Sequence, residues 1–162
     1  MRRGLLSGIV ALFVLGLCVP ARADFETAWE TLAQGDYATA SLELRSLAEQ
    51  GHANAQLLLG MHHIPGFSSN IEVQKVFPPD IEKAIRWLRK SAEQGHINAQ
   101  AILGDMYSEG KGVAKDAGEA ARWFRKVEEA AHQGIPEAQV FLGLMYRHGY
   151  GFAENKDIKE AI

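Results

Sequence analysis

The chain has 162 residues, of which 47% are hydrophobic, and its 17 basic and 20 acidic residues give a formal net charge of −3. This length suffices for one domain with a core of its own. The acidic balance, without a basic cluster on one predicted face, disfavours binding of nucleic acid.

Residues 1–23 have the three-part layout of a secretory signal peptide. Two arginines precede an uncharged, largely apolar stretch over residues 4–21, which closes on Ala21-Arg22-Ala23. Small residues at the first and third positions of that triplet predict cleavage after Ala23. The 18 uncharged residues fall just short of the roughly 20 that span a bilayer, so an uncleaved anchor is the alternative. Leu17 stands where a lipoprotein signal needs a small residue, which disfavours lipid attachment to Cys18.

Cleavage would change the chemistry available to the chain. It leaves 139 residues and removes three arginines, so that 14 basic residues face 20 acidic ones and the net charge becomes −6. It also removes the single cysteine, and with it any disulfide, thiol nucleophile or thiolate metal ligand. We therefore expect an exported protein, periplasmic or secreted, without stable membrane insertion after cleavage.

Residues 24–50 are predicted to form a helical hairpin that turns at Gly35-Asp36 and caps the structure that follows. Small and apolar residues recur there in a pattern similar to that of tetratricopeptide repeats: Ala28, Tyr37, Ala40 and Leu44.

From residue 48 onward one phrase occurs three times, which predicts a repeat protein. The phrase Ala-Glu-Gln-Gly-His begins at residues 48 and 92, a variant begins at 131, and each copy runs on into Ala-Gln and then Leu-Gly. The spacings of 44 and 39 residues both reduce to 36 when an insertion of eight in the first unit and of three in the second are removed. The predicted units are 51–94, with a loop insertion over 64–79, then 95–133 and 134–162. The third unit is incomplete, which indicates either a truncated chain or an unusual terminal cap.

Each unit is predicted to be a helix pair that cannot bury its apolar side alone. In the first helix an alanine, a leucine and an aromatic residue follow one another at every fourth position, which places them on one face. Paired glycines follow this helix, where a helix end favours positive φ values. A phosphate-binding loop is less favoured there because no strand precedes the glycines. The structural positions are Ala55, Leu59, Gly60, Trp87, Ala99, Leu103, Gly104, Tyr107, Gly110, Gly112, Trp123, Ala138, Leu142, Gly143, Tyr146, Gly149 and Gly151.

These units resemble Sel1-like repeats, which are relatives of the tetratricopeptide repeat. The residues that carry the resemblance are Gln94-Gly95, Ala99-Gln100, Leu103-Gly104, Tyr107, Gly110, Gly112-Val113, Asp116, Ala120 and Trp123. The resemblance implies an all-α fold, a right-handed α-solenoid of stacked antiparallel helix pairs, acting as a scaffold or adaptor for other proteins. Exported bacterial members are similar to regulators of envelope signalling or to factors that contact a host. A cysteine-rich branch is associated with β-lactams, but this chain lacks the cysteines of that branch.

The first unit departs from the family pattern. His63 replaces the expected tyrosine, Ser68 replaces the second glycine, and residues 64–79 add the extra loop. Irregular loops often carry binding specificity, which makes residues 67–77 a surface of interest.

No pattern of residues predicts catalysis, a metal site or a cofactor. His52 and His96 occupy the same repeat position, which indicates turn residues, and adjacent histidines such as His62 and His63 diverge on a helix by about 100°. The carboxylates are scattered over predicted outer faces rather than paired for acid and base roles. We expect no enzyme; the alternatives are an envelope enzyme acting on peptidoglycan or a β-lactam, and a glycan-binding scaffold that uses Tyr150, Phe152 and Trp29.

The first helices carry the candidate partner-binding residues. Two of the three units place apolar side chains on the side that is concave in tetratricopeptide stacks, which suggests a groove for a protein or peptide partner. The other interpretation is that these side chains pack against a neighbouring helix. The residues are Leu57, Met61, Ala101, Asp105, Val140 and Leu144.

Overall fold

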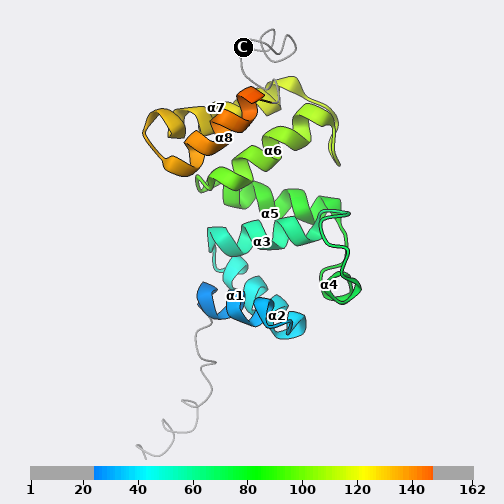
Figure 1. Ribbon diagram of the computed structural model, residues 1–162. Coiled ribbons are helices and arrows are strands. Elements are labelled where there is room, and N and C mark those ends of the chain that lie inside the picture. Colours follow the sequence, from blue (N-terminus) through cyan, green and yellow to red (C-terminus); the bar gives the residue numbers. More distant parts are fainter. Residues whose placement is uncertain (1–23, 148–162) are drawn as a thin grey trace, which may run out of the picture.

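The computed structural model describes residues 24–147, and within them the chain forms eight α-helices and no strand (Figure 1). The helices are α1 (Phe25–Ala33), α2 (Tyr37–Glu49), α3 (Ala53–His63), α4 (Ile71–Val76), α5 (Ile81–Glu93), α6 (Ile97–Glu109), α7 (Ala117–His132) and α8 (Pro136–Arg147). They pack as successive hairpins, α1 with α2, α3 with α5 and α6 with α7, and the hairpins stack into an all-α solenoid. The first helices of the three units are therefore α3, α6 and α8, and the second helices of the first two units are α5 and α7.

Aspartates start the helices that follow a loop. The Oδ1 atom of each aspartate accepts a hydrogen bond from the backbone N–H three residues later. The bonds to Asp36, Asp80 and Asp116 measure 3.1, 2.9 and 3.0 Å, at the starts of α2, α5 and α7. Each such cap satisfies a donor that the first helical turn leaves without a partner, and stabilises the helix by about 1 kcal/mol.

The repeated phrase forms the joint between units. A glutamine cap and then a glycine with positive φ follow α2, α5 and α7, and φ is +97° at Gly51, +90° at Gly95 and +84° at Gly134. The glutamine of the phrase then donates from Nε2 to the carbonyl oxygen of the alanine eight residues earlier. These bonds run from Gln56 to Ala48 (2.9 Å), Gln100 to Ala92 (3.0 Å) and Gln139 to Ala131 (3.4 Å). The phrase therefore recurs because each unit needs the same turn and the same side-chain bond across it.

A glycine lets the two helices of a unit approach closely. A Cβ on Gly60 would lie 2.7 Å from Leu88 Cγ, and a Cβ on Gly104 would lie 2.3 Å from Phe124 Cε1. For Gly143, the third copy, no described atom lies within 4 Å of that position. A close approach of two helices at the glycine is thus observed for Gly60 and Gly104.

The glycine turn of the second unit has the predicted backbone. Gly110 and Gly112 have φ values of +74° and +72°, and a Cβ on Gly112 would lie 2.0 Å from Ile81 Cγ1. The turn therefore packs directly on the start of α5. Gly149 and Gly151, the corresponding pair of the third unit, lie outside the described residues.

Three apolar clusters follow one another along the stack. The first joins α1, α2, α3 and α4, the second joins α3, α5 and α6 with Trp123 of α7, and the third joins α6, α7 and α8. The repeat alanines Ala55, Ala99 and Ala138 are fully buried at these joints. Leu59 and Leu103 are buried as predicted, whereas Leu142 is half-buried and Tyr146 is exposed.

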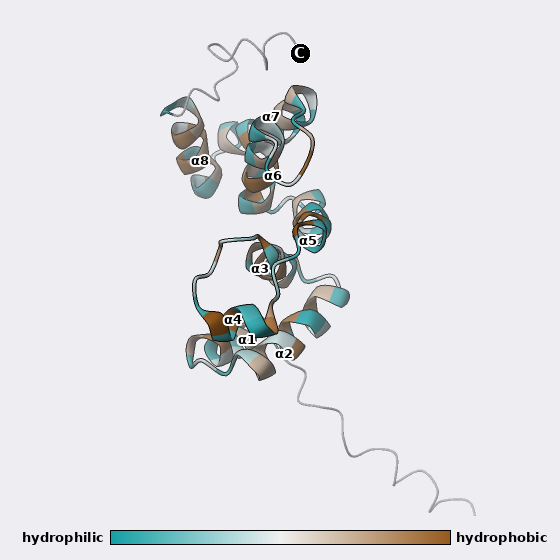
Figure 2. Ribbon diagram, turned by 90° about the vertical axis from the view of Figure 1, so that its right-hand side faces the viewer, coloured by the Kyte–Doolittle hydropathy of each residue, from teal (hydrophilic) through white to brown (hydrophobic). Residues whose placement is uncertain are grey.

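The inserted segment over residues 64–79 is more ordered than the loop that the sequence predicts. It contains α4, which lies beside α2 (Figures 1 and 2). Val73 of α4 and Phe77, which follows α4, are buried in the first cluster. The two ends of the insertion lie close together, because the Asp80 N–H donates to the His63 carbonyl over 2.8 Å. The second unit, which has no insertion at this place, has the same bond, from Asp116 to Tyr107 over 2.9 Å. The insertion is therefore accommodated outside the repeat geometry.

Candidate functional site

The six predicted partner-binding residues have three different environments. In the first unit, Leu57 is only 7% exposed and packs with Leu88, and Met61 packs against the same cluster. These two side chains therefore take the packing role that was the alternative for them. Val140 on α8 is 64% exposed. The remaining three, Ala101, Asp105 and Leu144, lie together around one cavity.

This apolar cavity has a volume of about 270 Å³ and lies where α6, α7 and α8 meet. Phe124 from α7 contributes to it between the two first helices. Asp105 is the one ionisable side chain among the residues that line the cavity. The lining residues are Ala101, Ile102, Asp105, Phe124, Phe141, Leu144 and Met145.

Two substitutions between units explain why the cavity is open at this joint. One unit earlier, Leu57 stands at the position of Ala101, and Met61 at the position of Asp105. There both side chains belong to a packed cluster that includes Leu88 and Ile102. At the later joint, alanine and aspartate supply less apolar volume, so the same place in the repeat is left open.

The edge of the cavity is held by ion pairs. Lys111 Nζ lies 3.2 Å from Asp105 Oδ2 and 2.5 Å from Glu109 Oε2. Hydrogen bonds to Glu109 and to Asp105 raise the pKa of Lys111 above its usual value, so it stays charged at neutral pH. Because these groups are exposed to solvent, the ion pairs stabilise the fold little and chiefly fix the Asp105 carboxylate beside the opening.

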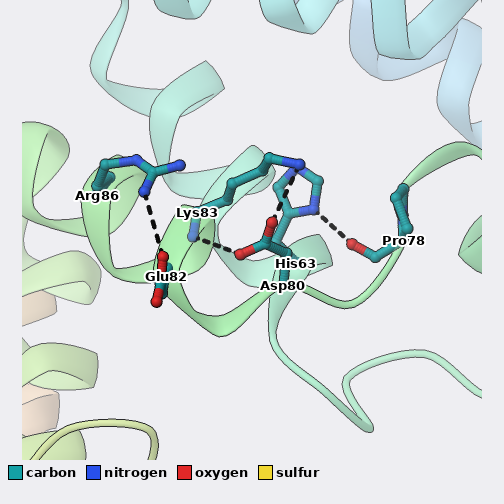
Figure 3. Close-up of polar contacts among 6 residues, drawn as sticks. All are labelled: His63, Pro78, Asp80, Glu82, Lys83 and Arg86. Atoms are coloured by element: carbon teal, nitrogen blue, oxygen red, sulfur yellow. Dashed lines mark hydrogen bonds and ion pairs between the residues drawn. The ribbon is translucent and has the colours of Figure 1, made fainter.

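Basic grooves lie between the second helices of neighbouring hairpins, where α2 is the second helix of the N-terminal hairpin. Their side chains come from helices that are far apart in the sequence. The first groove has a volume of about 310 Å³ between α2 and α5, with the end of α3 beneath. In it, Lys83 Nζ lies 3.0 Å from Asp80 Oδ2 and His63 Nδ1 bonds the Pro78 carbonyl over 2.8 Å (Figure 3). Its lining residues are Arg45, Glu49, Leu59, His63, Pro78, Lys83, Arg86, Trp87 and Lys90.

A second groove occupies the same place one unit later, between α5 and α7, with a volume of about 440 Å³. Its floor is Tyr107, the counterpart of His63, whose hydroxyl accepts from Arg89 Nη2 over 2.6 Å. In each groove one lysine lies over the tryptophan ring, Lys90 at 4.6 Å and Lys126 at 6.0 Å from the ring centroid. The lining residues are Arg89, Glu93, Tyr107, Glu119, Arg122, Trp123 and Lys126.

The expectation that no basic cluster lies on one face is therefore wrong. The cations of the first groove come from α2 and α5, far apart in the sequence, and only the hairpin stacking joins them. A signal was present in the sequence: Arg86, Trp87 and Lys90 recur 36 residues later as Arg122, Trp123 and Lys126.

Three of the described histidines, His52, His62 and His96, take part in packing and turns. His52 stacks on Phe25 at 5.0 Å between ring centroids, and His96 Nε2 lies 2.8 Å from Asn54 Oδ1. His62 stacks on Phe77 at 4.7 Å and meets Phe67 edge-on at 5.3 Å. Burial lowers the pKa of His62, and the neighbouring His63 lowers it further. Over residues 24–147, no three His, Cys, Asp or Glu side chains gather in a metal-binding group.

The structure bears on two further expectations, glycan binding and the absence of stable membrane insertion, only over residues 24–147. Trp29 of the glycan-binding alternative is exposed on α1, whereas Tyr150 and Phe152 lie outside the described residues. Of the helices over residues 24–147, none is both long enough and apolar enough to cross a membrane.

Comparison with known proteins identifies the repeats. The family described as Sel1 repeat matches residues 53–96, 97–134 and 136–162. A protective antigen present in uropathogenic Escherichia coli strains, displaying an SLR fold, is 34% identical with a TM-score of 0.58 over 76% of this chain. A Sel1 repeat protein from Oxalobacter formigenes is 38% identical with a TM-score of 0.48, over 67% of this chain and 73% of its own. This chain spans 25% of the length of the antigen. No curated protein matches the sequence.

Proposed function

The chain belongs to the Sel1 repeat family, and on that premise we propose that it binds a protein partner by taking up one large apolar side chain in the apolar cavity. Proteins of this family generally mediate protein–protein interactions and are typically not enzymes. The partner is a peptide or helix of another protein lying across the first helices α6 and α8.

The apolar cavity is the observation that carries this proposal. A cavity of about 150 Å³ in another protein holds benzene, so one of about 270 Å³ has room for an aromatic or large aliphatic side chain. Apolar anchors that fill such pockets supply most of the binding energy of an interface. Asp105, fixed beside the opening by Lys111, offers a polar group to the backbone or a basic side chain of the same partner.

Filling the cavity tests the proposal. Ala101→Leu introduces the residue that the first unit carries at the equivalent position, Leu57. Peptides selected from a random displayed library against the unaltered protein should share one large apolar residue. Their affinity for the variant, measured by calorimetry, should fall by about tenfold or more, because burying such a side chain contributes about 1.5–3 kcal/mol.

The matched control changes an equally apolar residue away from the cavity. Leu42 on α2 is 68% exposed, so Leu42→Ala should leave the affinity within about twofold, that is within about 0.5 kcal/mol. Helicity by circular dichroism should be unchanged in both variants. Selected peptides that bind Ala101→Leu as tightly as the unaltered protein would contradict the proposal.

The proposed function also includes export of the chain. The predicted cleavage site directly precedes Asp24, whose carboxylate caps α1 by accepting the Thr27 N–H over 2.8 Å. Processing there would leave the first helix and its cap intact. We propose that the processed protein acts in the periplasm or outside the cell, in envelope signalling or in contact with a host.

A further inference from the structure

The second helices carry an independent binding surface. We propose that the first and second grooves together bind a carboxylate-rich peptide segment of a protein partner, with acidic side chains entering each groove. This surface is formed by α2, α5 and α7, whereas the apolar cavity belongs to α6 and α8 with Phe124. The two proposals can therefore be tested independently of each other.

The two grooves repeat the same chemistry in the same register. Each contains an arginine from the preceding second helix, Arg45 or Arg89, six residues before the joint glycine. Each also contains an Arg-Trp-X-X-Lys run from the following second helix, starting at Arg86 or Arg122. Core packing does not require these positions, because all four arginines are exposed.

The charge of the grooves is opposite to that of the whole chain. Four cations and one carboxylate line the first groove, and three cations and two carboxylates line the second, in a chain of net charge −3. Lys83 pairs with the half-buried Asp80 that caps the same helix, and Arg86 pairs with the exposed Glu82 of that helix. Such pairs contribute about 0–1 kcal/mol and exchange readily for a carboxylate of a ligand.

A buried donor in the second groove points to a ligand acceptor. Trp123 is only 7% exposed, and its Nε1–H has no hydrogen-bond partner among the described residues. A buried N–H without an acceptor costs about 1–3 kcal/mol. The Nε1 atom is closed off from solvent, so a carbonyl or carboxylate oxygen of a bound peptide removes that cost only when the exposed side chains around it shift.

The lining carboxylates favour a peptide over a nucleic acid. Glu49 lies in the first groove, and Glu93 and Glu119 lie in the second. A polyphosphate backbone offers only acceptors and negative charge, so these glutamates would repel it. A peptide also offers backbone N–H donors, which the glutamates can accept.

The test uses a fluorescein-labelled, glutamate-rich peptide of about eight residues, which reaches roughly 25 Å when extended. Binding to the full chain is followed by fluorescence anisotropy at low salt. Combined Arg86→Gln and Arg122→Gln should weaken binding about tenfold or more, since each removes a charge-assisted contact. Trp123→Phe, which keeps the ring but removes the N–H, should weaken it severalfold.

The control is Arg125→Gln, which removes the same charge from the same helix, α7, at an exposed position outside both grooves. It should change the affinity by less than about twofold. The Ala101→Leu variant should bind the acidic peptide unchanged, which separates this surface from the apolar cavity. Circular dichroism should show the fold intact in every variant.

Three results would overturn the proposal. The first is no binding of the glutamate-rich peptide, or equal binding of a matched peptide with serine in place of glutamate. The second is an equal loss of affinity in Arg125→Gln, which would indicate unspecific attraction. The third is competition by inorganic phosphate or single-stranded oligothymidine at least as strong as that by the unlabelled peptide, which would assign the grooves to phosphates.

Discussion

At the scale of single residues, glycine sets how closely the two helices of a unit pack. In the second unit the Gly104 backbone lies against the Phe124 ring, and a Cβ there would come within 2.3 Å of the ring edge. Phe124 is itself buried in the third cluster, so it has little room to move.

Gly104→Ala should therefore lower the free energy of unfolding by about 1–3 kcal/mol, although alanine is intrinsically the better helix former. Urea denaturation followed by circular dichroism measures the change. The control is Gly118→Ala on α7, where the nearest contact is the exposed Asp116 carboxylate at 3.3 Å. The control should stay within about 0.5 kcal/mol of the unaltered chain. Equal stability of the two variants would contradict the packing role of Gly104.

A second residue-scale difference separates an open cavity from a filled joint. Ala101 and Leu57 are equivalent in the repeat, yet one borders an open cavity and the other fills its joint. The Ala101→Leu experiment described above exploits this difference, because the repeat itself shows that leucine fits the backbone at that position.

At the scale of elements, the insertion is attached to the first unit through aromatic contacts. His62 at the end of α3 stacks on Phe77 and meets Phe67 edge-on, and its Nδ1 is buried without a hydrogen-bond partner among the described residues. Burial, together with the charge of neighbouring His63, lowers the pKa of His62 below its ordinary value of 6.5. Protonation of His62 therefore opposes the packing of the insertion.

This gives a pH dependence with a defined sign. Because the pKa is lower in the folded than in the unfolded chain, the stability gained from neutral His62 is complete above about pH 6.5 and is lost as the pH falls toward the folded-state pKa. Between about pH 8 and about pH 5, the melting temperature of the unaltered chain should fall more than that of His62→Phe. The other titrating histidines are shared by both proteins, so the difference isolates His62. Parallel pH profiles would contradict this attachment.

At the scale of the whole molecule, stacked hairpins create two distinct surfaces. The first helices meet around the apolar cavity, while the second helices line the two basic grooves. A solenoid separates surfaces in this way because each unit contacts only its neighbours and presents its two helices on different sides.

Export also concerns the whole chain. Expressed in a Gram-negative host, the protein should be recovered from the periplasm or the medium with Asp24 as its first residue, as measured by mass spectrometry. Replacing both Ala21 and Ala23 by Asp should block processing, because the peptidase accepts only small residues there. Recovery of the unaltered chain from the cytoplasm, still carrying residues 1–23, would contradict the prediction.

The sequence by itself determined the helical repeat, its joints and the close-packing glycines. These features are local or recur with a fixed period: the turn glycines, the glutamine eight residues after its alanine, and the capping aspartates all act within a few residues. The sequence could not determine which candidate side chains are free to bind, since Leu57 and Ala101 share one periodic position. Only the stacking of hairpins decided that Leu57 fills its joint, whereas Ala101, although itself buried, borders a cavity. The basic grooves likewise exist only in the tertiary structure, because their floors and walls come from three helices that meet in space.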